Sequence, residues 1–252
     1  MSLMSWRELE EELARWRDAG RTADFWWRDD DASMLSPPLV RLLKLSKASG
    51  VPLALAVIPL QATPELFKGL EAAVLMHGTD HRNRAAAGEK KTEFAAAEPE
   101  AEAIGRLAAA RQRFARQAGA RFLPVLAPPW NRFKRSLAAG LASAGLHGLS
   151  GYGARSGAEA APGIKQVNTH VDIIDWHGTR GFTGEEAALR LAIRHLAARR
   201  GGGADADEPT GWLTHHAVHD GAAWEFLERL FERTRARGAR WMEPGALFPS
   251  RP

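Results

Sequence analysis

Short apolar runs alternate with amphipathic segments along nearly the whole chain, and this alternation limits the folds that the chain can adopt. Apolar runs that predict strands occupy residues 23–27, 51–58, 72–76, 122–126, 146–150, 165–174, 211–214 and 240–242. Segments that predict helices separate them, at residues 6–16, 37–49, 64–70, 100–117, 133–143, 183–199 and 224–237. Alternation of this kind predicts a parallel sheet with helical crossovers.

About seven parallel strands in 252 residues favour a distorted (β/α) barrel over an open doubly wound sheet. The dinucleotide-binding glycine pattern and the phosphate-loop pattern are both missing from the sequence. We therefore expect an α/β protein in which residues 1–252 form a single barrel domain. Residues 151–163 read as a loop.

Composition restricts the chemistry of any site. The chain has no cysteine, so a bound metal must use histidine, carboxylate or water ligands. The net charge of +4 comes from interspersed residues, and no dense basic run predicts nucleic-acid binding. The first residues are acidic and amphipathic, and no segment approaches the roughly 20 apolar residues of a membrane span. We expect a soluble cytoplasmic protein without a membrane partner.

Polar residues gather where the apolar runs end. The clusters are Asp29-Asp30-Asp31, His77 to His81, Pro128 to Asn131, Asp172 to Trp176 and Thr214 to His216. The carboxyl ends of the strands of a parallel barrel share one face, where such enzymes build their active sites. Five clusters at five strand ends therefore predict one functional site.

The first two clusters have the composition of a metal centre. Adjacent carboxylates repel one another and indicate a cation or a catalytic task, although a helix cap or an arginine partner is the alternative for any single one. His77 and His81 have a spacing that places two imidazoles on one side of a helix or tight loop. Two histidines and one carboxylate leave positions open for water and substrate, as catalytic zinc requires.

The later clusters suggest acid catalysis and charge stabilisation. Either His215 or His216 is expected to protonate a leaving group. Asp172 or Asp175 is expected to orient that histidine, and Trp176 to wall the pocket; an ordinary strand end is the alternative.

The proline-rich cluster predicts a stiff turn. The turn at Pro129 and Trp130 has the stiffness to present a backbone amide to an oxyanion, although a plain rigid turn fits equally well.

In this chain order, and over residues of about 24–216, the clusters resemble the motifs of the polysaccharide deacetylase superfamily (carbohydrate esterase family 4). The resemblance implies a distorted (β/α) barrel with seven strands. It implies that Asp30 is the general base and that Asp31 binds the metal, with a one-residue ambiguity that includes Asp29. His77 and His81 would be the metal histidines.

The resemblance also covers the remaining motifs. It implies an oxyanion site at Pro129 and Trp130, a fourth motif from Asp172 to Asp175 and Trp176, and a fifth motif containing Leu213 and the acid His215.

Two positions depart from the family pattern. Ala127 stands where the family has an arginine that holds the base, so either Arg28 or Arg132 replaces it or the base is tuned differently. Gly78 stands where the family has a hydroxyl residue.

Together these features predict a metal-dependent hydrolase that removes an N-acetyl or related acyl group from a carbohydrate or other small-molecule amide. The expected cofactor is a divalent metal, zinc by its ligand set. One alternative is a catalytically silent member of the same fold that binds metal or carbohydrate. Another is a barrel glycosidase with paired carboxylates and no metal requirement.

Overall fold

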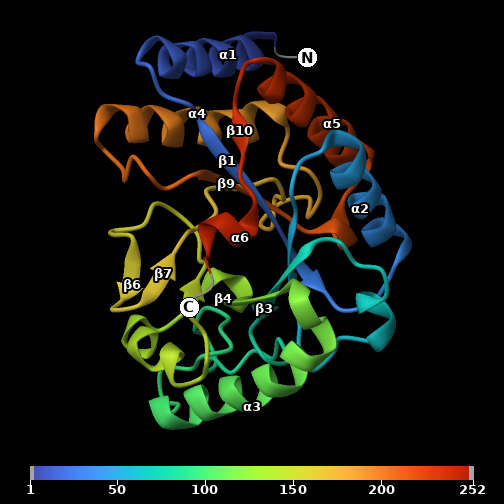
Figure 1. Ribbon diagram of the computed structural model, residues 1–252, viewed down its shortest axis with the longest axis vertical. Helices are drawn as coiled ribbons and strands as arrows, with labels where there is room; N and C mark the ends of the chain where they lie inside the picture. The colour runs from blue at the N-terminus through green and yellow to red at the C-terminus, as the bar shows by residue number, and fades with distance from the viewer. Residues whose placement is uncertain (1–2, 250–252) are drawn as a thin grey trace.

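The structure is a computed structural model that describes residues 3–249 (Figure 1). Its strands are β1 Asp24–Ala32, β2 Ala54–Val57, β3 Ala73–His77, β4 Phe122–Ala127, β5 Gly148–Leu149, β6 Glu159–Ala161, β7 Ile164–Gln166, β8 Val171–Asp172, β9 Thr210–Thr214 and β10 Arg240–Trp241. Its α-helices are α1 Leu3–Asp18, α2 Pro37–Ser49, α3 Glu100–Ala118, α4 Glu185–Gly201, α5 Gly221–Ala236 and α6 Pro244–Leu247. Short 3₁₀ helices are η1 Pro64–Phe67, η2 Gly119–Arg121, η3 Pro129–Asn131, η4 Arg135–Ala142 and η5 His216–Val218.

The strands form one sheet in the order β6-β7-β5-β4-β3-β2-β1-β9-β8, with β10 paired to β1. Strands β7 and β8 are consecutive pieces of one extended segment, residues 164–172. Its beginning pairs in parallel with β5, and its end pairs in parallel with β9. This segment therefore joins the two sides of the sheet and closes it into a barrel of seven strand positions.

The predicted α/β barrel is confirmed, with local differences. Residues 151–163, expected to be a loop, contain β6, which pairs antiparallel with β7. The helices expected at 64–70 and 133–143 are the 3₁₀ helices η1 and η4. Strand β1 is longer than predicted and runs on through the three aspartates.

Helices cover the outside of the barrel. In Figure 1, α1 and α4 lie together at the top, α5 and α2 follow the right edge, and α3 lies at the bottom. Trp6, Leu9, Leu13 and Trp16 recur at helical spacing on α1, and all four are buried. The apolar stripe that they form explains why α1 stays on α4.

Strand β1 shows how side chains divide between two layers. Phe25 and Trp27 belong to the core between the sheet and the helices. Trp26 belongs to a separate cluster inside the barrel with small residues of β2 and with Phe248, which follows α6. Because alternate residues of a strand face opposite sides, Arg28 and Asp30 are expected to face the barrel interior like Trp26, and Asp29 to face the helices like Trp27.

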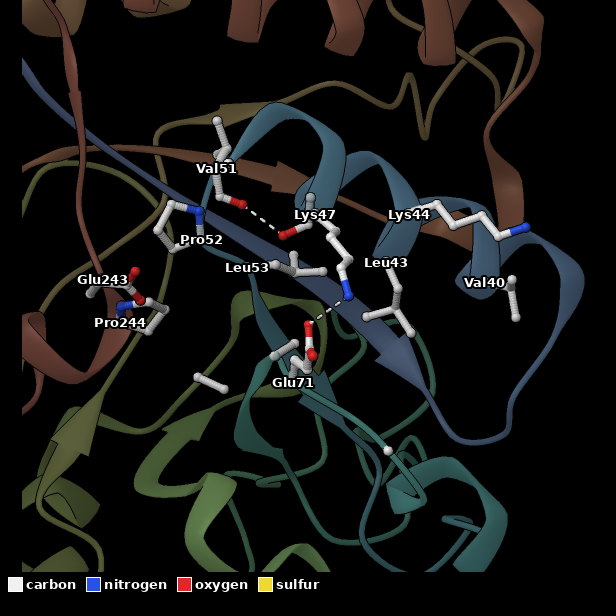
Figure 2. A pocket seen from close by; sticks show the side chains of 15 residues that line it. Val40, Leu43, Lys44, Lys47, Val51, Pro52, Leu53, Glu71, Glu243 and Pro244 are labelled. Carbon is white, nitrogen blue, oxygen red and sulfur yellow. Dashed lines mark hydrogen bonds and ion pairs between the residues drawn. The ribbon is translucent and has the colours of Figure 1, made fainter.

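The amino ends of the strands border a cavity. A cavity of about 480 Å³ opens there between α2 and the starts of β2 and β3. Figure 2 shows it, with Lys47 reaching toward Glu71 across an exposed ion pair of 3.8 Å. No histidine lines this cavity, so the candidate chemistry lies at the opposite end of the barrel. Among the described helices, none combines the length and the apolar character needed to cross a membrane.

Gly211 is a packing requirement of the barrel interior. A methyl group there would overlap the Trp26 indole nitrogen and the Asn168 carbonyl oxygen. We expect Gly211→Ala to lower the free energy of unfolding by about 1–3 kcal/mol, the usual cost of overpacking. The matched control is Gly105→Ala on exposed helix α3, where a methyl group meets nothing within 4 Å. It should raise stability by up to about 1 kcal/mol. Urea unfolding measures both, and equal effects would contradict the assignment.

Candidate functional site

The three adjacent aspartates at the end of β1 point to three different places. Asp29 lies on the side of the helices, where it meets Thr214 at the end of β9 and His216 just after it. Asp30 lies inside the barrel and pairs with Arg28. Asp31 has a positive φ of 69°, which breaks the strand alternation and turns its carboxylate toward His77. Separate partners explain how three carboxylates can be neighbours in sequence.

Asp31, His77 and His81 converge at the carboxyl end of the barrel. Oδ1 of Asp31 lies 3.1 Å from Nε2 of His77 and 3.2 Å from Nε2 of His81. His77 Nδ1 lies 3.0 Å from the Ala127 carbonyl, to which it donates, so its Nε2 lone pair faces Asp31. Oδ1 of Asp31 is buried without a hydrogen-bond donor. A buried carboxylate oxygen between two imidazole nitrogens fits a divalent cation.

The electrostatics of this group match the geometry. Burial by itself would raise the pKa of Asp31, but the adjacent imidazoles of His77 and His81 hold it well below its usual range. Burial would lower the pKa of His77, yet the Asp30 and Asp31 carboxylates raise it. Both shifts have the same cause: the negative charge of the carboxylates favours a positive charge beside them, either a cation or a proton on histidine.

Strained backbone is concentrated at this site. Five non-glycine residues among those described have positive φ, and four of them are Asp31, His81, Trp130 and Asn131. Each such residue costs of order 1 kcal/mol or more and persists only where surrounding contacts enforce it. The Trp130 ring also lies 4.4 Å from the His81 ring, centroid to centroid.

Glu93 holds the loop that carries the two histidines. Its carboxylate is buried and accepts hydrogen bonds from the backbone N–H groups of Thr79, at 2.7 Å, and His81, at 3.1 Å. It also accepts from the Thr79 hydroxyl and from the Arg106 guanidinium, the latter at 2.9 Å. This contact gives a role to residues 82–99, the long polar segment after β3. Only the length of that segment could have indicated this role from the sequence.

The position of Glu93 also explains why residue 78 is a glycine. The φ of Gly78 is 62°, and a methyl group there would overlap the Glu93 carboxylate and the Pro129 ring. The space that a hydroxyl side chain would need is therefore filled by Glu93. A glycine at position 78 therefore leaves room for the buried Glu93 carboxylate.

Arg28 lies inside the barrel beside Asp30. Its guanidinium is fully buried and grips Asp30 with two hydrogen bonds, from Nε at 2.8 Å and Nη2 at 3.0 Å. The remaining N–H groups go to the carbonyl and hydroxyl of Ser150, both at 2.7 Å, and to Oδ1 of Asn131 at 2.6 Å. Of the two arginines expected to replace the family residue, Arg28 is the one that contacts Asp30. Arg132 instead donates to the Lys91 carbonyl.

His215 lies near Asp172 and Trp176. Nδ1 of His215 is 3.9 Å from Oδ1 of Asp172, and its ring meets the Trp176 indole edge-on at 4.7 Å. The Trp176 indole N–H donates to Asp172 at 2.8 Å. Burial raises the pKa of Asp172. Asp175, the other expected partner, lies elsewhere: its carboxylate accepts the backbone N–H groups of the turn at residues 177–179.

The remaining predicted residues are placed as follows. Leu213 is buried on β9, between Arg28 of β1 and Asp172 of β8 in the strand register. Pro129 is buried against the His77–His81 loop, and Trp130 covers His81. His216 does not join His215 at Asp172, because its Nδ1 pairs with Asp29.

Solved structures share this architecture. A family 4 carbohydrate esterase from Streptomyces lividans matches with a TM-score of 0.56 and 15% identity, over 86% of this chain and 90% of that one. A chitin deacetylase from Colletotrichum lindemuthianum matches with a TM-score of 0.56 and 16% identity, over 92% and 89%. Puue allantoinase matches with a TM-score of 0.61 and 13% identity, over 89% and 88%. The chain has the fold of the family 4 carbohydrate esterases. No protein-family profile and no curated protein matches its sequence.

A second group of potential ligands, His170, His195 and Glu208, lies buried away from this site. The backbone N–H of Gly211 donates to His170 Nδ1 at 2.9 Å, so the proton of the neutral ring is on Nε2 and faces Glu208 at 3.3 Å. A protonated Nε2 cannot bind a metal. Glu208 also accepts two backbone N–H groups. We interpret the group as structural.

The Glu93 contact leads to a prediction for Gly78. We expect Gly78→Ala to weaken zinc binding at least about 10-fold, because the added methyl displaces Glu93 and the histidine loop with it. Gly88→Ala is the matched control: Gly88 also has a positive φ, but a methyl group there meets nothing within 4 Å. Calorimetric zinc titration distinguishes the two. Equal losses in both variants would show that backbone strain, not the Glu93 contact, matters.

The buried His195 predicts acid sensitivity. Burial and the neighbouring His170 and Arg199 lower the pKa of His195 to about 2. Between the ordinary value of 6.5 and 2, the unfolded chain binds a proton that the folded chain does not, so stability falls as pH falls. We expect His195→Asn to remove about 2 kcal/mol of the stability difference between pH 7 and pH 5. Denaturant unfolding of the wild type and the variant at pH 7 and pH 5 measures this stability difference. Thr210→Val removes the hydroxyl partner of His195 but keeps the histidine, and should leave the slope steep.

Proposed function

We propose that this protein is a metal-dependent amide hydrolase that removes an N-acetyl or related acyl group from a sugar or other small amide. The observation that carries the proposal is the convergence of Asp31, His77 and His81 beside a base candidate, Asp30, which Arg28 orients. The structural neighbours of this chain include a carbohydrate esterase, a chitin deacetylase and an allantoinase, which favours the same chemistry.

A divalent cation at this site would be held by Asp31, His77 and His81, and it would supply Lewis acidity to the substrate carbonyl and to water. His77 is buried, whereas the side chains of Asp31 and His81 are 35% and 22% exposed. The group is therefore open on one side, which suits a catalytic site better than a closed structural one.

Two groups are placed for proton transfer. Asp30 accepts the proton of the attacking water, and Arg28 fixes the direction of its carboxylate through two hydrogen bonds. His215 donates a proton to the nitrogen of the leaving amine, with Asp172 and Trp176 beside it. The turn at Pro129 and Trp130 supplies a backbone amide toward the developing oxyanion.

The surroundings of the site suit a small ligand with apolar surface. Among the described side chains, the large hydrophobic residues that are exposed all lie on loops after β1, β2, β5 and β8. They are Met34, Leu35, Leu60, Tyr152 and Trp176. Exposed apolar side chains gathered around a polar centre are typical of a binding site.

Both departures from the family pattern are compensated in this chain, which favours an enzyme over a silent binding protein. Arg28 performs the task that an arginine at position 127 would have. The Glu93 carboxylate supports the histidine loop where Gly78 leaves space for it.

We expect zinc-loaded protein to hydrolyse N-acetylated substrates, and Asp30→Asn to lower kcat at least about 100-fold while keeping its zinc. Asp175→Asn is the matched control, because Asp175 only caps an exposed turn. Release of acetate and calorimetric zinc titration measure the two properties. Near-full activity in Asp30→Asn would disprove the role of the base.

The metal assignment is tested separately. The variant with alanine at positions 31, 77 and 81 should bind no zinc, whereas the wild type should bind about one ion per chain. A wild-type protein that fails to bind zinc would overturn the proposal and favour the non-metal glycosidase.

A further inference from the structure

Asp29 is fully buried, and its carboxylate receives three hydrogen bonds from one short segment. The Thr214 hydroxyl donates to Oδ2 at 2.6 Å, and the backbone N–H of His216 donates to the same oxygen at 2.9 Å. Nδ1 of His216 donates to Oδ1. Asp29 and Thr214 are also register partners on β1 and β9. The carboxylate therefore ties both neighbours of His215 to strand β1.

His215 itself has no strong contact that fixes its ring. The distance of 3.9 Å between Nδ1 of His215 and Oδ1 of Asp172 is too long for a hydrogen bond. Nδ1 of His215 is therefore buried without a hydrogen-bond partner. Its contact with Trp176 is an edge-on aromatic one. The direction of the ring must then come largely from the backbone at residues 214–216, which Asp29 holds.

Asp29 is not placed for direct chemistry. Its carboxylate faces the helix side of β1, opposite to Asp30, and both oxygens are engaged. Negative charge in a buried position persists only when it is compensated, and His216 provides the compensation: its pKa is raised by Asp29 against the effect of burial.

We propose that Asp29, acting through Thr214 and His216, is a positioning residue that aims His215 at the leaving group. The inference rests on the proposed amide hydrolysis, in which His215 is the acid. It assigns a purpose to the extra aspartate before Asp30 and to the second histidine after His215.

The distinguishing measurement is the dependence on the leaving group. Hydrolysis of 4-nitroacetanilide needs a proton on the departing amine, whereas 4-nitrophenyl acetate releases a stable phenolate without one. Asp29→Asn should lower kcat for the anilide by about 10- to 100-fold and change kcat for the ester by less than about 3-fold. Damage to the metal site would lower both equally, and that result would overturn the proposal.

Two variants sharpen the comparison. Asp24→Asn makes the same substitution on the same strand, at a surface pair with Arg240, and should affect neither substrate. His216→Asn keeps an N–H donor near the position of Nδ1 and should retain most of the anilide activity, whereas His216→Ala should lose it. Equal losses in the two His216 variants would contradict the role of the hydrogen bond to Asp29.

A double-mutant cycle tests whether Asp29 acts through His215. In a His215→Ala background, Asp29→Asn should cause no further loss on the anilide. Additive losses would show that Asp29 acts independently of the acid, which overturns the proposal.

A measurement without turnover separates this proposal from the proposed function. Nuclear Overhauser contacts between the rings of His215 and Trp176 should be present in the wild type and lost in Asp29→Asn. If the wild type hydrolyses neither probe, the proposed function fails, while these contacts still report on the positioning. Unchanged contacts in Asp29→Asn would refute the positioning itself.

Discussion

The pairing of Arg28 with Asp30 inside the barrel is the interaction on which the candidate site depends. A guanidinium with no solvent exposure is stable only when its donors are matched, and here every N–H has an acceptor. Those acceptors come from β1 itself and from the segments that follow β4 and β5. One buried charge therefore fixes three strand ends relative to each other. It makes the barrel interior polar at the carboxyl ends of the strands, while Trp26 and its neighbours keep the rest of the interior apolar.

The site is built by departures from regular strand geometry. If Asp31 continued β1 regularly, its side chain would follow Asp29 toward the helices; its positive φ turns it to the histidines instead. His81 and Trp130 are held in the same left-handed region. Such conformations cost free energy, and buried hydrogen bonds such as those of Glu93 offset that cost. The arrangement of the three candidate ligands is therefore a property of the surrounding loops as much as of the ligands themselves.

Sequence periodicity was sufficient to predict the alternating strands and helices, and polar clusters at strand ends were sufficient to bring Asp31, His77 and His81 to one place. The contacts of Arg28 with Asn131 and Ser150 could not be predicted, because they span 103 and 122 residues and depend on side-chain direction inside a closed barrel. The choice between Asp172 and Asp175 depended on a turn that captures the second carboxylate. Strand β6, with the sequence Glu-Ala-Ala, lacks the β-branched residues that would have marked it.

Three separate sets of contacts position the candidate metal ligands, the candidate base and the candidate acid. Glu93 and Arg106 hold the histidine loop, Arg28 holds the base candidate, and Asp29 with His216 holds the segment of the acid candidate. The three pairs share no hydrogen bond with one another. Two of them meet on β1, however, where Arg28 and Asp30 face the interior and Asp29 faces the helices. A strand that presents alternate residues to opposite sides can support base and acid at once, which gives a physical reason for the run of charged residues from 28 to 31.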